Sequence, residues 1–171
     1  MSGGKTLFVD YSKCIGCETC EAVCRFIHDV PCISMTRTKE GLMVPLYCRH
    51  CEKPHCARAC PRGALIKDKD GAVILQPMLC RGCETRQCVL ACPYSALFLV
   101  ATGVAVRKCD ICAARRALGL GPACAEMCPC GAVKYVERSE LPAMATQESE
   151  ASLKKVMEHL RPALQNLKRS A

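Results

Sequence analysis

Apolar residues along the chain occur in short runs, and these runs alternate with cysteine-rich loops. Several runs have the length of β-strands, and Asp70-Gly71 between two of them is a strong hairpin signal. We expect a short helical turn after the third cysteine of each loop. This pattern predicts a small α+β protein. The expected strands cover residues 5–10, 41–46, 61–66, 72–75, 97–100, 104–106 and 132–136, with a turn at 101–103.

The pattern changes after Pro142, where a small, polar stretch leads into a helical repeat. Apolar residues recur there at three- and four-residue steps, which predicts an amphipathic helix with a break near Pro162. We therefore divide the chain into a body, residues 1–142, and a tail, residues 143–171. The tail either packs on its own domain or docks on a partner subunit or a second copy. Its apolar positions are Leu153, Val156, Met157, Leu160, Leu164 and Leu167.

No signal for secretion or membrane insertion is recognisable in the sequence. The first ten residues contain no apolar segment and no twin arginine. Ser2 stands where N-myristoylation requires glycine. No stretch approaches the roughly 18 apolar residues that a spanning helix needs. The expected location is cytoplasmic, where disulfides are rare and a cysteine-rich pattern indicates metal binding.

Cysteine dominates the composition, with 18 of 171 residues, whereas Trp is absent. Such a chain needs cross-links or metals to fold, because it cannot build a large apolar core. Cys32 and Cys130 are expected to be buried free thiols, and the other cysteines form four motifs. These are Cys14-x2-Cys17-x2-Cys20-x3-Cys24, Cys48-x2-Cys51-x4-Cys56-x3-Cys60, Cys80-x2-Cys83-x4-Cys88-x3-Cys92 and Cys109-x2-Cys112-x11-Cys124-x3-Cys128.

Three close cysteines followed by a fourth predict iron–sulfur clusters. Three thiolates on a short loop can surround three corners of a cubane, and the fourth ligates the neighbouring cluster in two-cluster ferredoxins. Soft thiolates select iron–sulfur clusters or zinc, and zinc is the alternative because Cys-x2-Cys pairs are common zinc ligands. Zinc sites do not favour the third and fourth cysteines at these offsets. The repeated spacing therefore favours iron–sulfur clusters.

The loop lengths predict which motifs share clusters. Nineteen residues separate Cys60 from Cys80 and contain the expected hairpin, which is the linkage inside a two-cluster ferredoxin. Motifs two and three then form an inner unit, about residues 41–100, and motifs one and four form an outer unit. The expected ligand sets are Cys48, Cys51, Cys56 and Cys92; Cys80, Cys83, Cys88 and Cys60; Cys14, Cys17, Cys20 and Cys128; and Cys109, Cys112, Cys124 and Cys24.

The four motifs resemble those of the four-[4Fe-4S] polyferredoxin subunits of the dimethyl sulfoxide reductase iron–sulfur family. The resemblance covers residues 5–138 and includes the wide gap between Cys112 and Cys124. Arg25 follows Cys24 where the other motifs have proline, and the family often relaxes that position. The resemblance implies nested, tandem bacterial-ferredoxin-like units with four [4Fe-4S] clusters. Such subunits serve formate dehydrogenases, hydrogenases, carbon monoxide dehydrogenases and tungsten aldehyde oxidoreductases.

The sequence contains no recognisable catalytic constellation, such as a Gly-rich nucleotide loop, paired carboxylates or a Ser/His/Asp arrangement. We therefore predict a non-catalytic subunit that relays single electrons. One partner is the catalytic subunit of a cytoplasmic Mo/W oxidoreductase, for example an aldehyde oxidoreductase or formate dehydrogenase, and the other is a second redox protein. The alternatives are an iron–sulfur subunit of a hydrogenase or carbon monoxide dehydrogenase, a free diffusible polyferredoxin, and a zinc protein that binds nucleic acid.

The formal net charge of +8 suggests an anionic partner at first sight. An oxidised cubane with four thiolates carries about −2, however, so four clusters would cancel that charge. His50 and His55, in motif two, are expected near the clusters or at the surface rather than as ligands. Positive side chains near a cluster favour its reduced form. Those close to the motifs are Arg25, Arg49, Lys53, Arg58, Arg62, Arg81, Arg86, Arg107, Lys108, Arg115 and Arg116.

Overall fold

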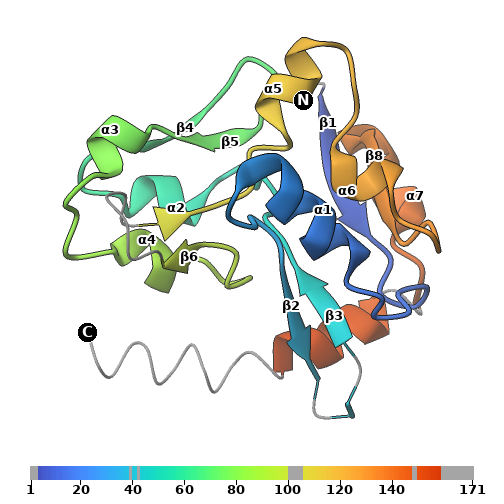
Figure 1. Ribbon diagram of the computed structural model, residues 1–171. Coiled ribbons are helices and arrows are strands. Elements are labelled where there is room, and N and C mark those ends of the chain that lie inside the picture. The colour runs from blue at the N-terminus through green and yellow to red at the C-terminus, as the bar shows by residue number, and fades with distance from the viewer. Residues whose placement is uncertain (1–3, 39, 42, 100–105, 148–149, 159–171) are drawn as a thin grey trace.

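The computed structural model describes residues 4–38, 40–41, 43–99, 106–147 and 150–158, which form short strands and short helices (Figure 1). The strands are β1 (Lys5–Val9), β2 (Ser34–Arg37), β3 (Met43–Leu46), β4 (Leu65–Lys67), β5 (Val73–Leu75), β6 (Phe98–Leu99), β7 (Val106–Arg107) and β8 (Val133–Glu137). The helices are α1 (Thr19–His28), α2 (His55–Arg58), α3 (Pro77–Cys80), α4 (Gln87–Leu90), α5 (Ala113–Ala117), α6 (Ala123–Glu126), the 3-10 turn η1 (Arg138–Glu140) and α7 (Leu141–Met144). The protein is thus a small α+β fold, as predicted.

The described strands pair as four two-stranded antiparallel sheets, β1–β8, β2–β3, β4–β5 and β6–β7. The β1–β8 pairing places Lys5 opposite Glu137 and Val9 opposite Val133. It therefore joins the first and last strands of the body. In Figure 1 these strands lie on the right with α1 and α6, whereas α2, α4, β4 and β5 lie on the left. Helix α1 packs against α6, and α2 packs against α4.

Most of the predicted strands are present. The strands expected at 5–10 and 132–136 correspond to β1 and β8, and the hairpin expected around Asp70-Gly71 is β4–β5. Strand β2 was not predicted, because its sequence Ser-Met-Thr-Arg has no apolar run; it forms by pairing with β3. In the second predicted hairpin β6 pairs with β7. The turn expected at 101–103 lies outside the described residues.

The first part of the tail packs on the body. Residues 150–158 are helical, and Val156 on this helix is only 2% exposed. Leu153 and Met157 pack against the same core, beside Tyr11 and Tyr47. In this segment the helix therefore covers its own domain; the break at Pro162 and the positions Leu160, Leu164 and Leu167 lie outside the described residues. Of the helices that the structure describes, none has the length and apolar character to cross a membrane.

Arginines from the last third of the chain hold the β4–β5 turn. Arg116 on α5 donates hydrogen bonds to Asp68 (2.7 Å) and Asp70 (2.6 Å), and its side chain is only 9% exposed. Arg138 donates to the carbonyls of Gly71 (3.2 Å) and His50 (2.9 Å). Burial acts to raise the pKa of Asp68, but the hydrogen bonds it accepts, first that from Arg116, bring the pKa below its ordinary value. These contacts join the two halves seen in Figure 1.

Replacing Arg116 with methionine should destabilise the protein. The variant loses both charge-assisted hydrogen bonds and leaves Asp68 partly buried without its partner, which costs about 1–3 kcal/mol. We expect the melting temperature of the anaerobically purified protein to fall by several degrees. Arg37→Met is the matched control, because Arg37 is exposed and donates to the carbonyl of Gly41. Equal melting temperatures for the two variants would show that the contacts of Arg116 do not stabilise the fold.

Candidate metal centres

The first Cys-x2-Cys pair of each motif has a left-handed third residue. The backbone N–H of His50 donates to Cys48 Sγ (3.4 Å), and that of Ile111 donates to Cys109 Sγ (3.3 Å). A left-handed conformation costs about 1–2 kcal/mol for residues other than glycine. Strain of this kind persists where the surroundings require it, commonly at functional sites. The four third residues are Gly16 (φ 70°), His50 (φ 46°), Gly82 (φ 65°) and Ile111 (φ 56°).

A second turn follows the last cysteine of motifs two, three and four. The N–H groups of Gly63, Ser95 and Gly131 donate to the carbonyls of Cys60, Cys92 and Cys128, respectively, at 3.2–3.4 Å. All three donors are left-handed. An alanine that is 1% exposed comes next in each case: Ala64, Ala96 and Ala132. The repeated sequence Cys-Pro-x-Gly/Ser-Ala is the signal for this turn, and only its proline entered the prediction.

In motif one, Cys32 takes the place of that alanine. Its backbone N–H donates to Cys24 Sγ (3.2 Å), just as the N–H of Ala64 donates to Cys60 Sγ (3.3 Å). Cys32 is buried and free, as predicted. The same prediction was wrong for Cys130, which is partly exposed because it lies on the turn, with its Sγ 3.7 Å from that of Cys128.

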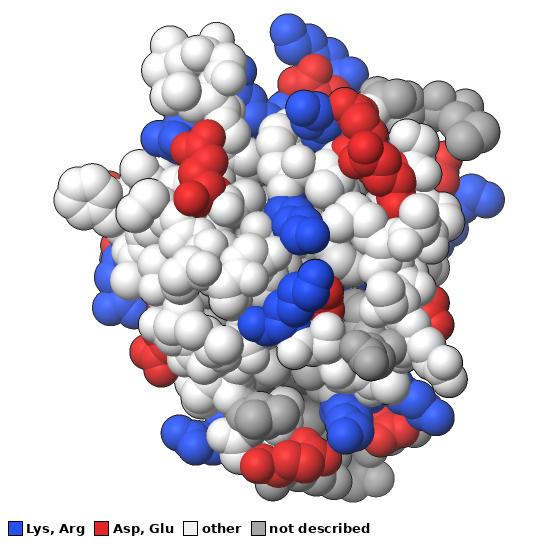
Figure 2. All heavy atoms as spheres, turned by 90° about the vertical axis from the view of Figure 1, so that its right-hand side faces the viewer, with Lys and Arg blue, Asp and Glu red and all other residues white. Residues whose placement is uncertain are grey.

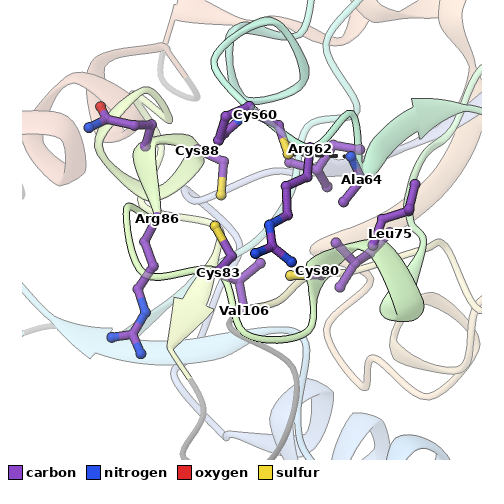
Figure 3. Close-up of a pocket in the computed structure, with 13 residues that line it drawn as sticks. Cys60, Arg62, Ala64, Leu75, Cys80, Cys83, Arg86, Cys88 and Val106 are labelled. Carbon is purple, nitrogen blue, oxygen red and sulfur yellow. Dashed lines mark hydrogen bonds between the residues drawn. The ribbon is translucent and has the colours of Figure 1, made fainter.

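We divide the cysteines of the four motifs into four groups that follow the expected ligand sets. Group D has the most direct geometry, because its four thiols line one pocket. Their sulfur atoms point toward this shared space in Figure 3. We name the groups A (Cys14, Cys17, Cys20, Cys128), B (Cys24, Cys109, Cys112, Cys124), C (Cys48, Cys51, Cys56, Cys92) and D (Cys60, Cys80, Cys83, Cys88).

Mutual electrostatic effects show that groups A and B also contain thiols from distant motifs. Burial, with smaller contributions from the thiols of Cys14 and Cys128, raises the pKa of Cys20 to about 12. Burial is also the main cause of the raised pKa of Cys124, and the thiols of Cys112 and Cys24 make the next largest contributions. Cys128 and Cys24 are therefore close to the motif at the other end of the body, as the swapped pairing requires.

The same effects place Cys92 with motif two. Burial raises the pKa of the Cys92 thiol, and Cys48 and Cys51 contribute to the same shift. Burial also raises the pKa of Cys56 to about 11, with contributions from Cys48 and Cys92. The structure thus brings Cys48, Cys51, Cys56 and Cys92 together.

The groups fit a bound iron–sulfur cluster. A buried thiol with a raised pKa keeps its proton unless a metal replaces it, so metal binding must supply the energy of ionisation. The group D thiols share their pocket with the apolar side chains of Ala64, Leu75 and Val106. Among the described residues, no set of three or more His, Cys, Asp or Glu is arranged to hold a single ion.

The histidines do not belong to the thiol groups, but two of them lie beside these groups. His50 is fully buried, and its Nδ1 accepts from the N–H of Val73 (3.0 Å); it lies beside group C rather than at the surface. His55 is exposed, and its Nδ1 lies 2.7 Å from Nη2 of Arg58. His28, which carried no signal in the sequence, places Nε2 3.4 Å from Cys112 Sγ.

Basic side chains near the groups act partly as internal braces. Arg62 donates to the carbonyls of Arg81 (2.7 Å) and Gly82 (3.3 Å), so it links the Cys60 turn to the Cys80–Cys83 loop. In Figure 3 Arg62 crosses the pocket mouth and Arg86 points away. Figure 2 shows another face of the molecule, where positive and negative side chains are interspersed among uncharged ones. That face carries no basic patch of the kind that binds nucleic acid.

The Cys-x2-Cys turns predict different tolerances for two glycines. At Gly82 an added Cβ meets nothing within 4 Å, so Gly82→Ala costs only the left-handed strain, about 1–2 kcal/mol. At Gly16 the Cβ would lie 2.9 Å from Cβ of Met43, which adds about 1–3 kcal/mol of overpacking. We expect Gly16→Ala to have the lower melting temperature and iron content after anaerobic purification. Identical values for both variants would contradict the tight contact at Met43.

Comparisons with known proteins agree with this geometry. Residues 39–138 match the family model described as a 4Fe-4S dicluster domain, and residues 7–26 match a 4Fe-4S binding domain. The B subunit of anaerobic dimethyl sulfoxide reductase from Escherichia coli K12 is 36% identical over 153 residues. The match covers 78% of this protein and 74% of that subunit.

Two further relatives extend the comparison. Thiosulfate reductase electron transfer subunit PhsB of Salmonella typhi is 34% identical, covering 77% of this protein and 76% of its own length. Electron transport protein HydN of Escherichia coli K12 is 35% identical, covering 83% and 93%. With these matches and its cysteine groups, this protein belongs to the dimethyl sulfoxide reductase family of iron–sulfur electron-transfer subunits, whose members bind [4Fe-4S] clusters.

Proposed function

We propose that this protein is a four-cluster electron wire, with one [4Fe-4S] cluster held by each of groups A to D. It relays single electrons between the catalytic subunit of a Mo/W oxidoreductase and a second redox partner. The proposal is supported by thiols of one group that contribute to pKa shifts in the next, which favours an arrangement of the four groups in a row. When bound, each cluster can take up and release one electron.

The order of the row follows from thiols that influence each other across group boundaries. The Cys20 thiol of group A contributes to the raised pKa of Cys124 in group B, where burial is the main cause. The Cys48 thiol of group C contributes in the same way to that of Cys109 in group B. The Cys56 thiol of group C contributes to that of Cys88 in group D. These neighbours support the order A, B, C, D.

The order also supports nested ferredoxin-like units. Groups C and D combine motifs two and three, and groups A and B combine motifs one and four. The pairing of β1 with β8 and the packing of α1 on α6 bring the outer motifs together. The body is then the inner unit enclosed by the outer one, and the tail from residue 143 is an addition to it.

Exposure of the thiols supports electron entry and exit at the two ends of the row. All four cysteines of group B are buried, and so are three of group C. Group A contains the exposed Cys17, and group D contains the partly exposed Cys60 and Cys83. The end at group A has an exposed apolar neighbour, Ile15, whereas Arg62 and Arg86 line the pocket at group D. Surfaces of such different chemistry favour two different partners.

The named relatives support a catalytic reductase subunit as one of these partners. Two of them are subunits of dimethyl sulfoxide reductase and thiosulfate reductase, and the third is named an electron transport protein. Among possible catalytic partners, we propose a Mo/W subunit such as that of an aldehyde oxidoreductase or formate dehydrogenase. A cytoplasmic location accompanies the proposal, because clusters with an exposed ligand such as Cys17 need a reducing compartment.

Iron content and electron paramagnetic resonance test the four-cluster assignment. Protein purified anaerobically should contain about 16 iron atoms per chain and take up about four electrons, since each cubane holds four irons and accepts one electron. Cys128→Ser should remove the cluster of group A alone, with the loss of about a quarter of the iron. A colourless, zinc-loaded protein would overturn the proposal.

Cys130→Ser is the matched control for Cys128→Ser. The two cysteines are two residues apart and their sulfurs are 3.7 Å apart, but only Cys128 belongs to a group. The control should retain about 16 irons. Loss of iron from the Cys130 variant, with none from the Cys128 variant, would show that the ligand at this turn has been assigned to the wrong cysteine.

The tail provides a test of self-association. Because Leu153, Val156 and Met157 already pack on the body, we propose that contacts with a second copy or a partner involve residues after 158. Truncation after Glu158 should leave the melting temperature within about 2 °C, since it removes no residue of this packed segment, and should lower the molecular mass measured by light scattering to that of a monomer. An assembled truncation variant would place the contact elsewhere.

A further inference from the structure

Lys108 is a buried cation at the boundary between the outer and inner motifs. It directly precedes Cys109, and it is only 5% exposed. Its Nζ donates hydrogen bonds to the carbonyls of Cys109 and of Val73 on β5. One side chain therefore bridges the start of motif four and the hairpin of the inner unit.

This position lies between groups B and C. Burial raises the pKa of Cys109 in group B far above its ordinary value, and the charge of Lys108 is the largest opposing effect. Lys108 also opposes the raised pKa of Cys56 in group C, for which burial is again the main cause. Lys108 is therefore next to Cys109 of group B, and its hydrogen bond to Val73 leads to group C, because the N–H of Val73 donates to His50 and the N–H of His50 donates to Cys48 Sγ.

Among the described residues, the hydrogen-bond partners of Lys108 carry no negative charge. Both of its hydrogen-bond acceptors are carbonyls rather than carboxylates. Arg116 and Arg138, the nearby cations, are held by Asp68 and Asp70 and by carbonyl oxygens, respectively. The carboxylate on the group B side is Asp110, whose Oδ1 is buried and unpaired among the described residues.

His50 adds no charge at this boundary. Burial, followed by the charges of Lys108, Arg138 and Arg116, holds the pKa of His50 well below its ordinary value. Its Nδ1 accepts the N–H of Val73, so the neutral ring carries its proton on Nε2. Val73 is therefore held on both sides, by His50 at its N–H and by Lys108 at its carbonyl. The ring fills the space beside group C without competing with the charge of Lys108.

Burying a cation without a counter-charge costs free energy, because carbonyl dipoles replace only part of its hydration. An anionic group on each side would offset that cost, and the proposed clusters of groups B and C are anionic. Each becomes more negative when it is reduced, so a nearby fixed positive charge favours the reduced form and raises the potential. Water cannot screen this interaction where the cation is 5% exposed.

We propose that Lys108 is an electrostatic positioning residue that raises the reduction potentials of the two middle clusters relative to the two end clusters. This inference rests on the proposed four-cluster function. Lys108 holds its ammonium at the junction through Val73 and Cys109. It lowers the energy of an electron at the junction where the outer unit meets the inner one.

The test is a redox titration of the anaerobically purified full chain, followed by electron paramagnetic resonance. Lys108→Gln keeps N–H donors for the two carbonyls but removes the charge. Two of the four midpoint potentials should fall, each by about tenfold in the equilibrium constant for reduction, which is about 59 mV for a one-electron couple. The other two should stay where they are in the unmodified protein. Lys108→Arg should keep all four potentials close to those values.

Lys53→Gln is the control for loss of a lysine near a cluster. Lys53 lies two residues after Cys51, but its side chain is exposed, so solvent screens its charge. This variant should leave all four potentials unchanged. If Lys108→Gln fails to hold its clusters, Lys108→Met provides a second neutral variant at the same site, and its potentials are compared in the same way.

The outcomes separate the inference from the function on which it rests. Unmodified protein with four one-electron signals, but with unchanged potentials in Lys108→Gln, overturns the inference alone. Equal shifts in the Gln and Arg variants would mean that hydrogen-bond geometry, and not charge, matters, which also overturns it. A shift of all four potentials together would show a global change of structure, which overturns it as well. Unmodified protein without clusters would overturn both the inference and the proposed function.

Discussion

The antiparallel pairing of β1 with β8 is the contact on which the arrangement of the thiols depends. It joins strands more than a hundred residues apart, and the loop-closure cost grows only slowly with that length. Cys128 lies just before β8 and accepts a hydrogen bond from the N–H of Val133 in that strand (3.4 Å). Groups A and B each contain thiols from both ends of the body, so neither group exists without this pairing.

Two residues in the cysteine loops have strained backbone conformations that serve the thiol groups. His50 and Ile111 adopt left-handed conformations, which is unusual for a β-branched residue such as Ile111, and their N–H groups then point at thiol sulfurs. Both of these thiols are buried, and burial raises the pKa of Cys109 well above its ordinary value. Metal binding is what compensates for both costs, so folding and cluster binding are coupled in a body with few large apolar side chains.

Several basic side chains make contacts within the protein. Arg62, Arg138 and Lys108 donate to backbone carbonyls, and Arg116 donates to Asp68 and Asp70. These contacts fasten cysteine loops to one another and the outer motifs to the inner hairpin. Basic side chains therefore serve as braces as well as counter-charges for anionic clusters.

The sequence by itself determined the cysteine motifs, the α+β class and the main hairpin, because spacing and turn chemistry are local. For group D, the four thiols expected from the swapped pattern line one pocket. Only the tertiary structure decided what depends on distant segments: strand β2, which needs β3; Cys32, which replaces the buried alanine of the other motifs; and the burial of Lys108 and His50 against Val73. A sequence marks such residues as basic or polar, but their environment is set by the segments that pack around them.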